Sequence, residues 1–128
     1  MSDELMASLI NAARAREALG FVNYDARLDR AAQLHAADLA ARRVLSHGSG
    51  PDNTLTVGDR VTAQGYTWSL VAENVAFNQR DTEDVFQAWM TSDGHRANIL
   101  APGITHFGFG GASNDMGPYW AQVFAAPL

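Results

Sequence analysis

Residues 85–100, VFQAWMTSDGHRANIL, join an amphipathic helical pattern to a polar break that carries a histidine. Apolar side chains recur here at the spacing of one helix face. That face comprises Val85, Phe86, Trp89 and Met90. Thr82 is the predicted N-cap, and the acidic residues that follow suit the positive end of a helix. The break at Ser92-Asp93-Gly94 ends this helix, and a second short helical turn is predicted from His95 to Ile99.

Two longer helices are predicted at the N-terminal end of the chain. The first runs from Asp3 to Leu19 and ends at Gly20, where a left-handed cap is easiest. The second runs from Leu28 to about Arg43. His35 lies on the apolar stripe of this second helix, so we expect a buried and hydrogen-bonded histidine there.

The middle of the chain alternates loop signals with short elements. Ser46 to Asn53 has the composition of a loop. A short helix is predicted from Thr56 to Gln64, with Thr56 as its cap and Asp59 three residues further on. Tyr66 to Asn78 mixes aromatic and β-branched residues, which is typical of a short strand or of an irregular segment.

The last quarter of the chain changes to the alternating period of strands. Ile104 to Gly110 and Tyr119 to Ala125 alternate on either side of a turn at Asn114 to Gly117, which predicts a β-hairpin. Both strands are apolar on both faces, so we expect a central sheet covered by helices on each side. The glycines from Gly108 to Gly111 lie within this hairpin, which favours close packing over a nucleotide-binding loop.

Composition and charge exclude several classes of protein. The chain has 128 residues, a net charge of −5 at pH 7 and no cysteine. A negative chain repels phosphate backbones, so nucleic acid is not an expected partner. Disulfides, thiol nucleophiles and cysteine-ligated metals cannot occur, and we expect three tryptophans and six phenylalanines to hold the core. No apolar run approaches the ~18 residues of a membrane span, and the acidic start lacks the pattern of a secretory signal.

Three ionisable residues lie in predicted loops or in apolar surroundings: His47, Glu73 and His95. A buried carboxylate such as Glu73 is costly unless it is paired, hydrogen-bonded or bound to a cation. Two imidazoles and a carboxylate could ligate zinc and leave one position for water. The residues alone also allow a purely structural role for these three side chains. In that case the histidines hydrogen-bond to loop backbones, and Glu73 accepts hydrogen bonds from neighbouring amides.

A hydrolase is a further interpretation of the same residues. Ser46, Ser49 or Ser92 could act as the nucleophile, with a histidine as base and Glu73 as the orienting acid. The Gly-x-Ser-x-Gly motif is missing, because Gly48-Ser49-Gly50 is preceded by histidine and followed by proline. Glu83, Asp93 and His106 are further ionisable residues in predicted loops or at helix ends that could carry chemistry of either kind.

Several segments together resemble the family of cysteine-rich secretory proteins, antigen 5 and pathogenesis-related 1 proteins, which is defined by the CAP or SCP domain. LSHGS at residues 45–49 is similar to the first histidine motif of this family, and AENVA at 72–76 is similar to its Gly-Glu-Asn-Leu motif. Residues 85–100 resemble the Trp-x-x-Ser-x-Gly-His-Arg-x-Asn-Ile stretch of bacterial members. HFGFG at 106–110 and YWAQVF at 119–124 resemble the closing hairpin, so the resemblance covers essentially the whole chain.

The resemblance implies a fold and a site. The implied fold is α+β, a three-layer α-β-α sandwich with a small, mainly antiparallel sheet, in a single domain over residues 1–128. The implied site is a central cleft with two histidines and two acids, which in some members binds a divalent metal, often zinc. Three of its four positions are matched by His47, Glu73 and His95, and the cysteines of eukaryotic members are missing, as in many bacterial members.

The fourth position of the implied site departs from the family pattern. Ser92 stands where complete members have the second acid, and neither Asp93 nor Glu83 aligns with that position. We expect metal binding to be possible but weaker, because the acids act mainly through water or by orienting the histidines. Ser92, Asp93, Asn74 and Ser46 are the predicted surroundings of the cleft.

The resemblance also implies a function and a location. We expect a non-enzymatic, secreted-type binding domain whose cleft takes Zn²⁺ or another divalent cation, and which also accepts an apolar small molecule or lipid. The alternatives are a metal-dependent or serine-type hydrolase and a scaffold or adhesion domain with a vestigial cleft. The family resemblance implies an extracellular or periplasmic location. The chain itself shows no signal peptide from which the location could be predicted. The oligomeric state is left open.

Overall fold

A computed structural model describes residues 2–128. Within this range the helices are α1 (Ser2–Arg16), α2 (Ala26–Arg42), α3 (Val57–Ala63), α4 (Thr82–Met90) and α5 (Asp93–Ile99). The strands are β1 (Asn23–Tyr24), β2 (Trp68–Phe77), β3 (His106–Asn114) and β4 (Gly117–Pro127). Each predicted helix is therefore present, and the undecided segment Tyr66 to Asn78 contains a ten-residue strand.

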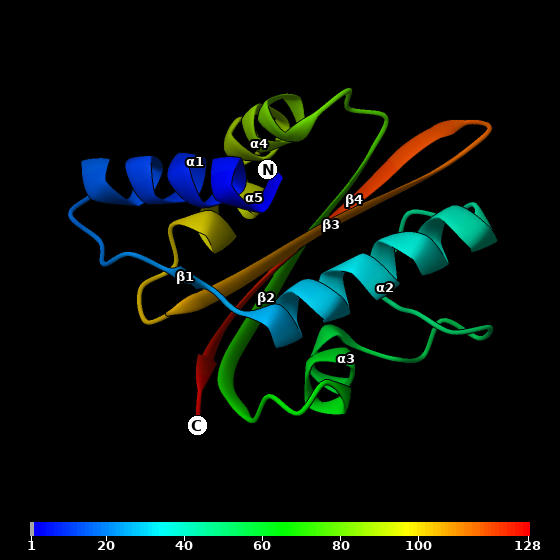
Figure 1. Ribbon diagram of the computed structural model, residues 1–128, viewed down its shortest axis with the longest axis horizontal. Coiled ribbons are helices and arrows are strands. Elements are labelled where there is room, and N and C mark those ends of the chain that lie inside the picture. The colour runs from blue at the N-terminus through cyan, green and yellow to red at the C-terminus, as the bar shows by residue number, and fades with distance from the viewer. Residues whose placement is uncertain (1) are drawn as a thin grey trace.

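The strands form one sheet in the order β1-β3-β4-β2. β3 and β4 form the predicted hairpin, β2 pairs antiparallel with β4, and the short β1 runs parallel to β3. Figure 1 shows α1, α4 and α5 on one side of the sheet and α2 and α3 on the other. The α-β-α sandwich with a small, mainly antiparallel sheet is thereby confirmed.

The glycine-rich segment of β3 packs directly on α2. A Cβ atom on Gly108 would lie 2.2 Å from the backbone of Leu28 and Asp29, and one on Gly110 would lie 2.5 Å from Gln33. A larger side chain at either position would push helix and strand apart. The packing role predicted for these glycines is confirmed.

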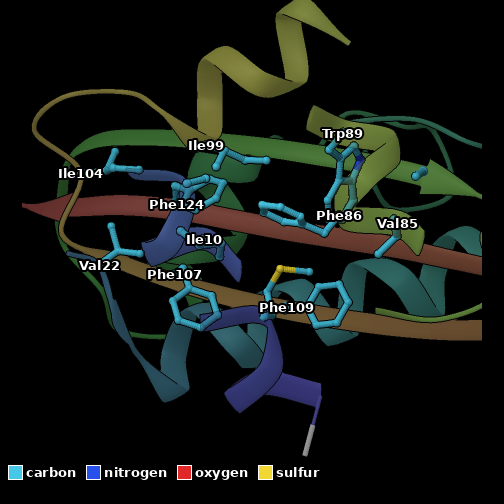
Figure 2. Close-up of a cluster of buried hydrophobic side chains, with 13 residues drawn as sticks. Ile10, Val22, Val85, Phe86, Trp89, Ile99, Ile104, Phe107, Phe109 and Phe124 are labelled. Carbon is cyan, nitrogen blue, oxygen red and sulfur yellow. The ribbon is translucent and has the colours of Figure 1, made fainter. Parts of the chain in front are cut away.

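One apolar core fills the space between the sheet and the layer of α1, α4 and α5 (Figure 2). Trp89 from α4 is 1% exposed, and Phe107 and Phe124 from the hairpin are fully buried. A second core lies between the sheet and the α2–α3 layer, around Leu39, Val61 and Tyr66 among others. The prediction that all six phenylalanines hold the core is wrong at Phe21, which is 68% exposed.

Helix ends differ from the predictions at several places, and α2 and α5 begin at Ala26 and Asp93 instead of Leu28 and His95. α1 ends at Arg16, and the left-handed residue is Ala18 (φ 57°) instead of Gly20, because the chain turns back early and the Leu19 N–H bonds to the Arg14 carbonyl. The N-cap of α4 is Asp81 and not Thr82, since the Asp81 carboxylate accepts from the Asp84 N–H.

The two-residue strand β1 was not predicted. Asn23 donates to the Thr105 carbonyl at 2.9 Å, and Asp25 donates to the Phe107 carbonyl at 3.0 Å. A pairing this short leaves no alternating pattern in the sequence. Within residues 2–128, no helix combines the length and the apolar character that crossing a bilayer requires.

Candidate functional site

The candidate site lies along β2, an edge strand of the sheet. Successive residues of a strand point to opposite faces, and Glu73 and Asn74 do so here. Glu73 meets His47 from the loop before α3, with 3.1 Å between His47 Nδ1 and Glu73 Oε1. Asn74 meets α5, where its amide donates to the His95 carbonyl at 3.0 Å. Two distant segments are thus brought to neighbouring positions of one strand.

The Glu73 carboxylate is buried, with its side chain 1% exposed. Arg60 donates to its Oε2 atom, and His47 lies against its Oε1 atom. A third basic group, the Nε2 atom of His35, lies 3.7 Å from Oε1. These partners meet the condition for a buried carboxylate, which is pairing and hydrogen bonding on both oxygens.

His47 has a fixed ring orientation although its side chain is 63% exposed. The hydrogen bond to Glu73 raises the pKa of His47, against the opposing effect of burial. A carboxylate can only accept, so the proton of the neutral ring is on Nδ1. The Nε2 atom of neutral His47 therefore keeps its lone pair for an electrophile or a metal ion.

The imidazole ring of His95 is held by Ser92. Its Nδ1 atom lies 2.9 Å from the Ser92 hydroxyl. Ser92 is the N-cap of α5 but makes no side-chain cap bond, so its hydroxyl serves the ring instead. Burial lowers the pKa of His95, and the nearby His47 lowers it further. Both effects favour the neutral imidazole of His95 over its charged form.

A buried amide network fixes α5 to the sheet beneath His95. The Asn74 amide also donates to Gln122 Oε1 at 2.9 Å, and Asn98 donates to Asn74 Oδ1 at 2.8 Å. Asn74 and Gln122 are fully buried. Each member is satisfied, so the network holds the backbone of His95 in one position. Asn74 thus lies on the opposite face of β2 from Glu73.

Arg60 is a central residue of the site that the sequence predictions missed. Its Nη1 group donates to the His47 carbonyl at 2.8 Å and to the Ser49 hydroxyl and the Leu55 carbonyl at 3.1 Å. Together with its bond to Glu73, these contacts fasten the loop before α3 onto β2. The sequence pattern could have indicated a buried arginine here, because Arg60 lies beside Val61 and three residues after Val57, on the apolar face of a short helix.

The remaining predicted residues are divided between the site and its surroundings. The Ser46 carbonyl bonds to Nε2 of buried His35, and the Ser46 hydroxyl donates to Asn53 Oδ1 at 2.9 Å, so Ser46 shapes the loop. Asp93 is exposed in the first turn of α5, and Glu83 is exposed on α4. His106 lies elsewhere, with its Nδ1 atom 2.9 Å from the Tyr66 hydroxyl.

Two cavities lie near the site, on the side of the sheet that α2 and α3 cover. One of about 330 Å³ lies against His47 and Glu73 and is walled by residues 53–57. Another of about 320 Å³ lies between α2 and α3, with Leu34 and Leu55 in its wall. Across residues 2–128, no group of three or more His, Cys, Asp or Glu side chains is placed to hold a metal ion.

A three-layer sandwich with a histidine–glutamate pair at an edge strand, and a second histidine near that pair, is the arrangement that the sequence resemblance to SCP domains implies. Among solved structures, an extracellular protein containing an SCP domain from Bacillus anthracis str. Ames matches with a TM-score of 0.82 at 31% identity. The match covers 95% of this chain and 39% of that chain. An outer surface protein from Borrelia burgdorferi has the same fold, with a TM-score of 0.87 at 20% identity over 99% of this chain and 93% of that one.

The model of the cysteine-rich secretory protein family, CAP, matches residues 7–124, and the chain belongs to this family. Among curated proteins, the uncharacterized protein YkwD of Bacillus subtilis (strain 168) is 32% identical over 125 residues, which is 95% of this chain and 46% of YkwD. The uncharacterized membrane protein YlbC of the same organism is 28% identical over 109 residues, 85% of this chain and 31% of YlbC. The chain thus spans less than half the length of each of these relatives.

Proposed function

We propose that this CAP domain is a non-enzymatic binding module whose cleft takes a divalent transition metal ion through Nε2 of His47 and Nε2 of His95. The observation that carries the proposal is the engagement of both Nδ1 atoms, one by Glu73 and the other by Ser92. Metal-binding histidines generally donate their second ring N–H to such a partner, which fixes the ring and raises its basicity.

Glu73 acts on the ion through His47 in this proposal. Its Oε1 atom faces His47 Nδ1 and its Oε2 atom accepts from Arg60, so both oxygens are engaged on the protein side. A bound ion would supply Lewis-acid polarisation of a ligand oxygen. With two imidazoles and water as ligands, zinc or copper suits the donors better than magnesium or calcium, and we expect modest affinity.

The proposal is tested by titrating Zn²⁺ into chelator-treated protein by calorimetry. We expect His47→Ala and His95→Ala to weaken binding at least about tenfold, since each removes one of two protein ligands. His106→Ala is the matched control, because His106 is an imidazole bonded to Tyr66 outside the cleft. Equal weak binding by all four proteins would contradict the proposal.

A hydrolase is the second candidate function, and one contact favours it. The Ser92 hydroxyl lies 2.9 Å from Nδ1 of His95, which the lowered pKa keeps neutral and able to act as a base. The two functions need different ring tautomers. A metal ligand needs the proton on Nδ1, whereas a serine nucleophile needs it on Nε2. The nitrogen-15 shifts of the His95 ring distinguish them, and a proton on Nδ1 supports the binding module.

The proposal includes a location outside the cytoplasm and a second, apolar ligand. Two similar structures are described as an extracellular protein and an outer surface protein, which supports a location outside the cytoplasm. An apolar ligand remains a prediction, for which the hollow between α2 and α3 is the place to look. A scaffold domain with a vestigial cleft is the outcome if neither zinc nor an apolar ligand binds.

A further inference from the structure

The outer edge of β2 can be read from its pairing with β4. Asn78, directly after the strand, donates to the Pro118 carbonyl at 2.8 Å, and Ala76 is paired with Trp120. In an antiparallel pair the residues that bond to the partner alternate with residues whose backbone groups face away. The even-numbered residues of β2 therefore bond to β4, and the backbone groups of Val71, Glu73 and Val75 face outward.

Side chains from α4 and α5 cover the C-terminal half of this edge. Trp89 Nε1 donates to the Val75 carbonyl at 3.2 Å, and Asn98 Nδ2 donates to the Glu73 carbonyl at 3.2 Å. Such caps are how proteins protect an edge strand from pairing. The caps stop at Glu73, beside the cleft.

The edge is open on the N-terminal side of Glu73. Within residues 2–128, no hydrogen bond reaches the outward N–H or C=O of Val71. Leu70 beside it is 46% exposed, and Val71 itself is half-buried. One residue thus offers a backbone donor and a backbone acceptor in the same direction, which is the pattern that a neighbouring strand recognises.

Apolar surface and the histidine cleft flank this open edge. Leu55 is 50% exposed in the wall of the hollow beside His47 and Glu73, and Val57 lines the same hollow. A chain laid along the edge would place alternate side chains against this wall. Because Glu73 follows Val71 by two residues, the same chain would continue towards His47 and His95.

We propose that the open edge of β2 at Val71 binds an extended peptide by strand addition, with the peptide running into the histidine cleft. This deepens the proposed function, because it names the class of ligand for the same cleft. Affinity would come from backbone hydrogen bonds, and side-chain preference from the apolar wall. The net charge of −5 suits a peptide that carries basic residues.

The test uses the full chain labelled with nitrogen-15, a chelator, and the peptide acetyl-KTVTVTK-amide. We expect saturable shifts of the Val71 and Glu73 amide signals and slower hydrogen exchange at Val71. Val71→Pro removes the outward N–H and should weaken binding roughly tenfold, as loss of one backbone hydrogen bond. Val71→Ala trims the same side chain but keeps the N–H, so peptide binding should fall less in this variant than in Val71→Pro.

A second arm does not depend on the folding of Val71→Pro. The same peptide with N-methyl groups on alternate residues keeps its charge and side chains but loses one row of donors, so its shifts should disappear. Equal binding of both peptides, or shifts away from residues 69–73, would overturn the inference. Zinc and peptide titrations of the unsubstituted chain separate this inference from the proposed function. Peptide binding without zinc binding leaves the edge site standing, and zinc binding without peptide binding removes it.

Discussion

The Nδ1 atom of His47 lies 3.1 Å from Oε1 of Glu73, a contact between a side chain that is 63% exposed and one that is 1% exposed. The carboxylate is thus hidden beneath the imidazole that it orients. The exposed ring can meet a ligand, while the charge that fixes its tautomer is shielded from water and from salt.

Replacing Glu73 by glutamine should weaken zinc binding about tenfold or more, because an amide oxygen is a weaker acceptor for the His47 N–H than a carboxylate. Calorimetric titration with Zn²⁺ measures the change. Glu83→Gln is the matched control, since Glu83 is exposed on α4 and should leave the affinity unchanged. Unchanged affinity in Glu73→Gln would show that the carboxylate does not act through His47.

The metal-free protein should gain stability from His47 on the acid side of neutrality. The pKa of His47 is raised above its ordinary value of 6.5 by the bond to Glu73. A raised pKa in the folded state stabilises the fold fully below that ordinary value, and this stability is lost as pH rises through the folded pKa. The gain is small, because the side chain is largely exposed.

Urea unfolding of the chain and of His47→Gln, both with chelator, measures this dependence. The advantage of the unsubstituted chain should be larger near pH ~5.5 than near pH ~8. The contributions of His35 and His95, whose pKa values are lowered by burial, are present in both proteins and largely cancel in the difference. An advantage that grows with pH would contradict the raised pKa.

Replacing Arg60 by methionine should lower the free energy of unfolding by about 3–5 kcal/mol, because it leaves the buried Glu73 carboxylate without its cationic partner. The loop that carries His47 also loses its hydrogen bonds to the guanidinium. Urea unfolding measures the loss. Arg80→Met is the control, because the Arg80 side chain is 86% exposed and its pair with Asp84 is at the surface. A loss of less than about 1 kcal/mol would mean that water replaces the guanidinium.

Most of the fold could be predicted from the sequence, because its helices and its hairpin have local patterns of apolar residues. Helix faces and the hairpin follow from local periodicity, which the residues between Val85 and Trp89 display plainly. His47, Glu73 and His95 were predicted from the short motifs in which they lie, and the structure brings His47 and Glu73 into contact. Capping chemistry was also predictable at α3, where Thr56 and Asp59 form the expected capping box.

The partners of Glu73 could not be predicted in the same way. Arg60 and His35 come from different helices, and only the packing of α2 and α3 on one face of the sheet brings them to Glu73. Local periodicity placed His35 in the core, where it is fully buried, but carried no information about which carboxylate it faces. The short strand β1 was missed because two residues leave no pattern.

Adding a methyl group at Gly108 should prevent normal packing of β3 on α2. The new Cβ would lie 2.2 Å from the α2 backbone, which cannot move away as a flexible side chain would. We expect Gly108→Ala to cost about 3 kcal/mol or more, at the upper end of overpacking effects. Gly94→Ala in α5 is the control, because a Cβ there meets nothing within 4 Å and alanine favours a helix. Thermal unfolding of both variants measures the difference, and equal melting temperatures would refute the close packing.

Restoring an acid at position 92 should strengthen the proposed metal site. The Ser92 hydroxyl lies 2.9 Å from Nδ1 of His95, and an aspartate carboxylate there would accept from the ring N–H as Glu73 does from His47. Aspartate is also a good N-cap, so α5 should not be weakened by Ser92→Asp. We expect zinc affinity to rise about tenfold in Ser92→Asp and to fall in Ser92→Ala, which removes the partner of Nδ1.

Calorimetry with Zn²⁺ and an ester-hydrolysis assay on the same three proteins separate the candidate functions. If Ser92 is a nucleophile, Ser92→Asp and Ser92→Ala both abolish hydrolysis, because neither side chain carries a hydroxyl. If Ser92 orients a metal ligand, the two variants change zinc affinity in opposite directions. A rise in Ser92→Asp beside a fall in Ser92→Ala therefore supports the binding module. Identical zinc affinity in all three proteins would show that His95 needs no partner on Nδ1, and the proposed two-histidine site would lose its main support.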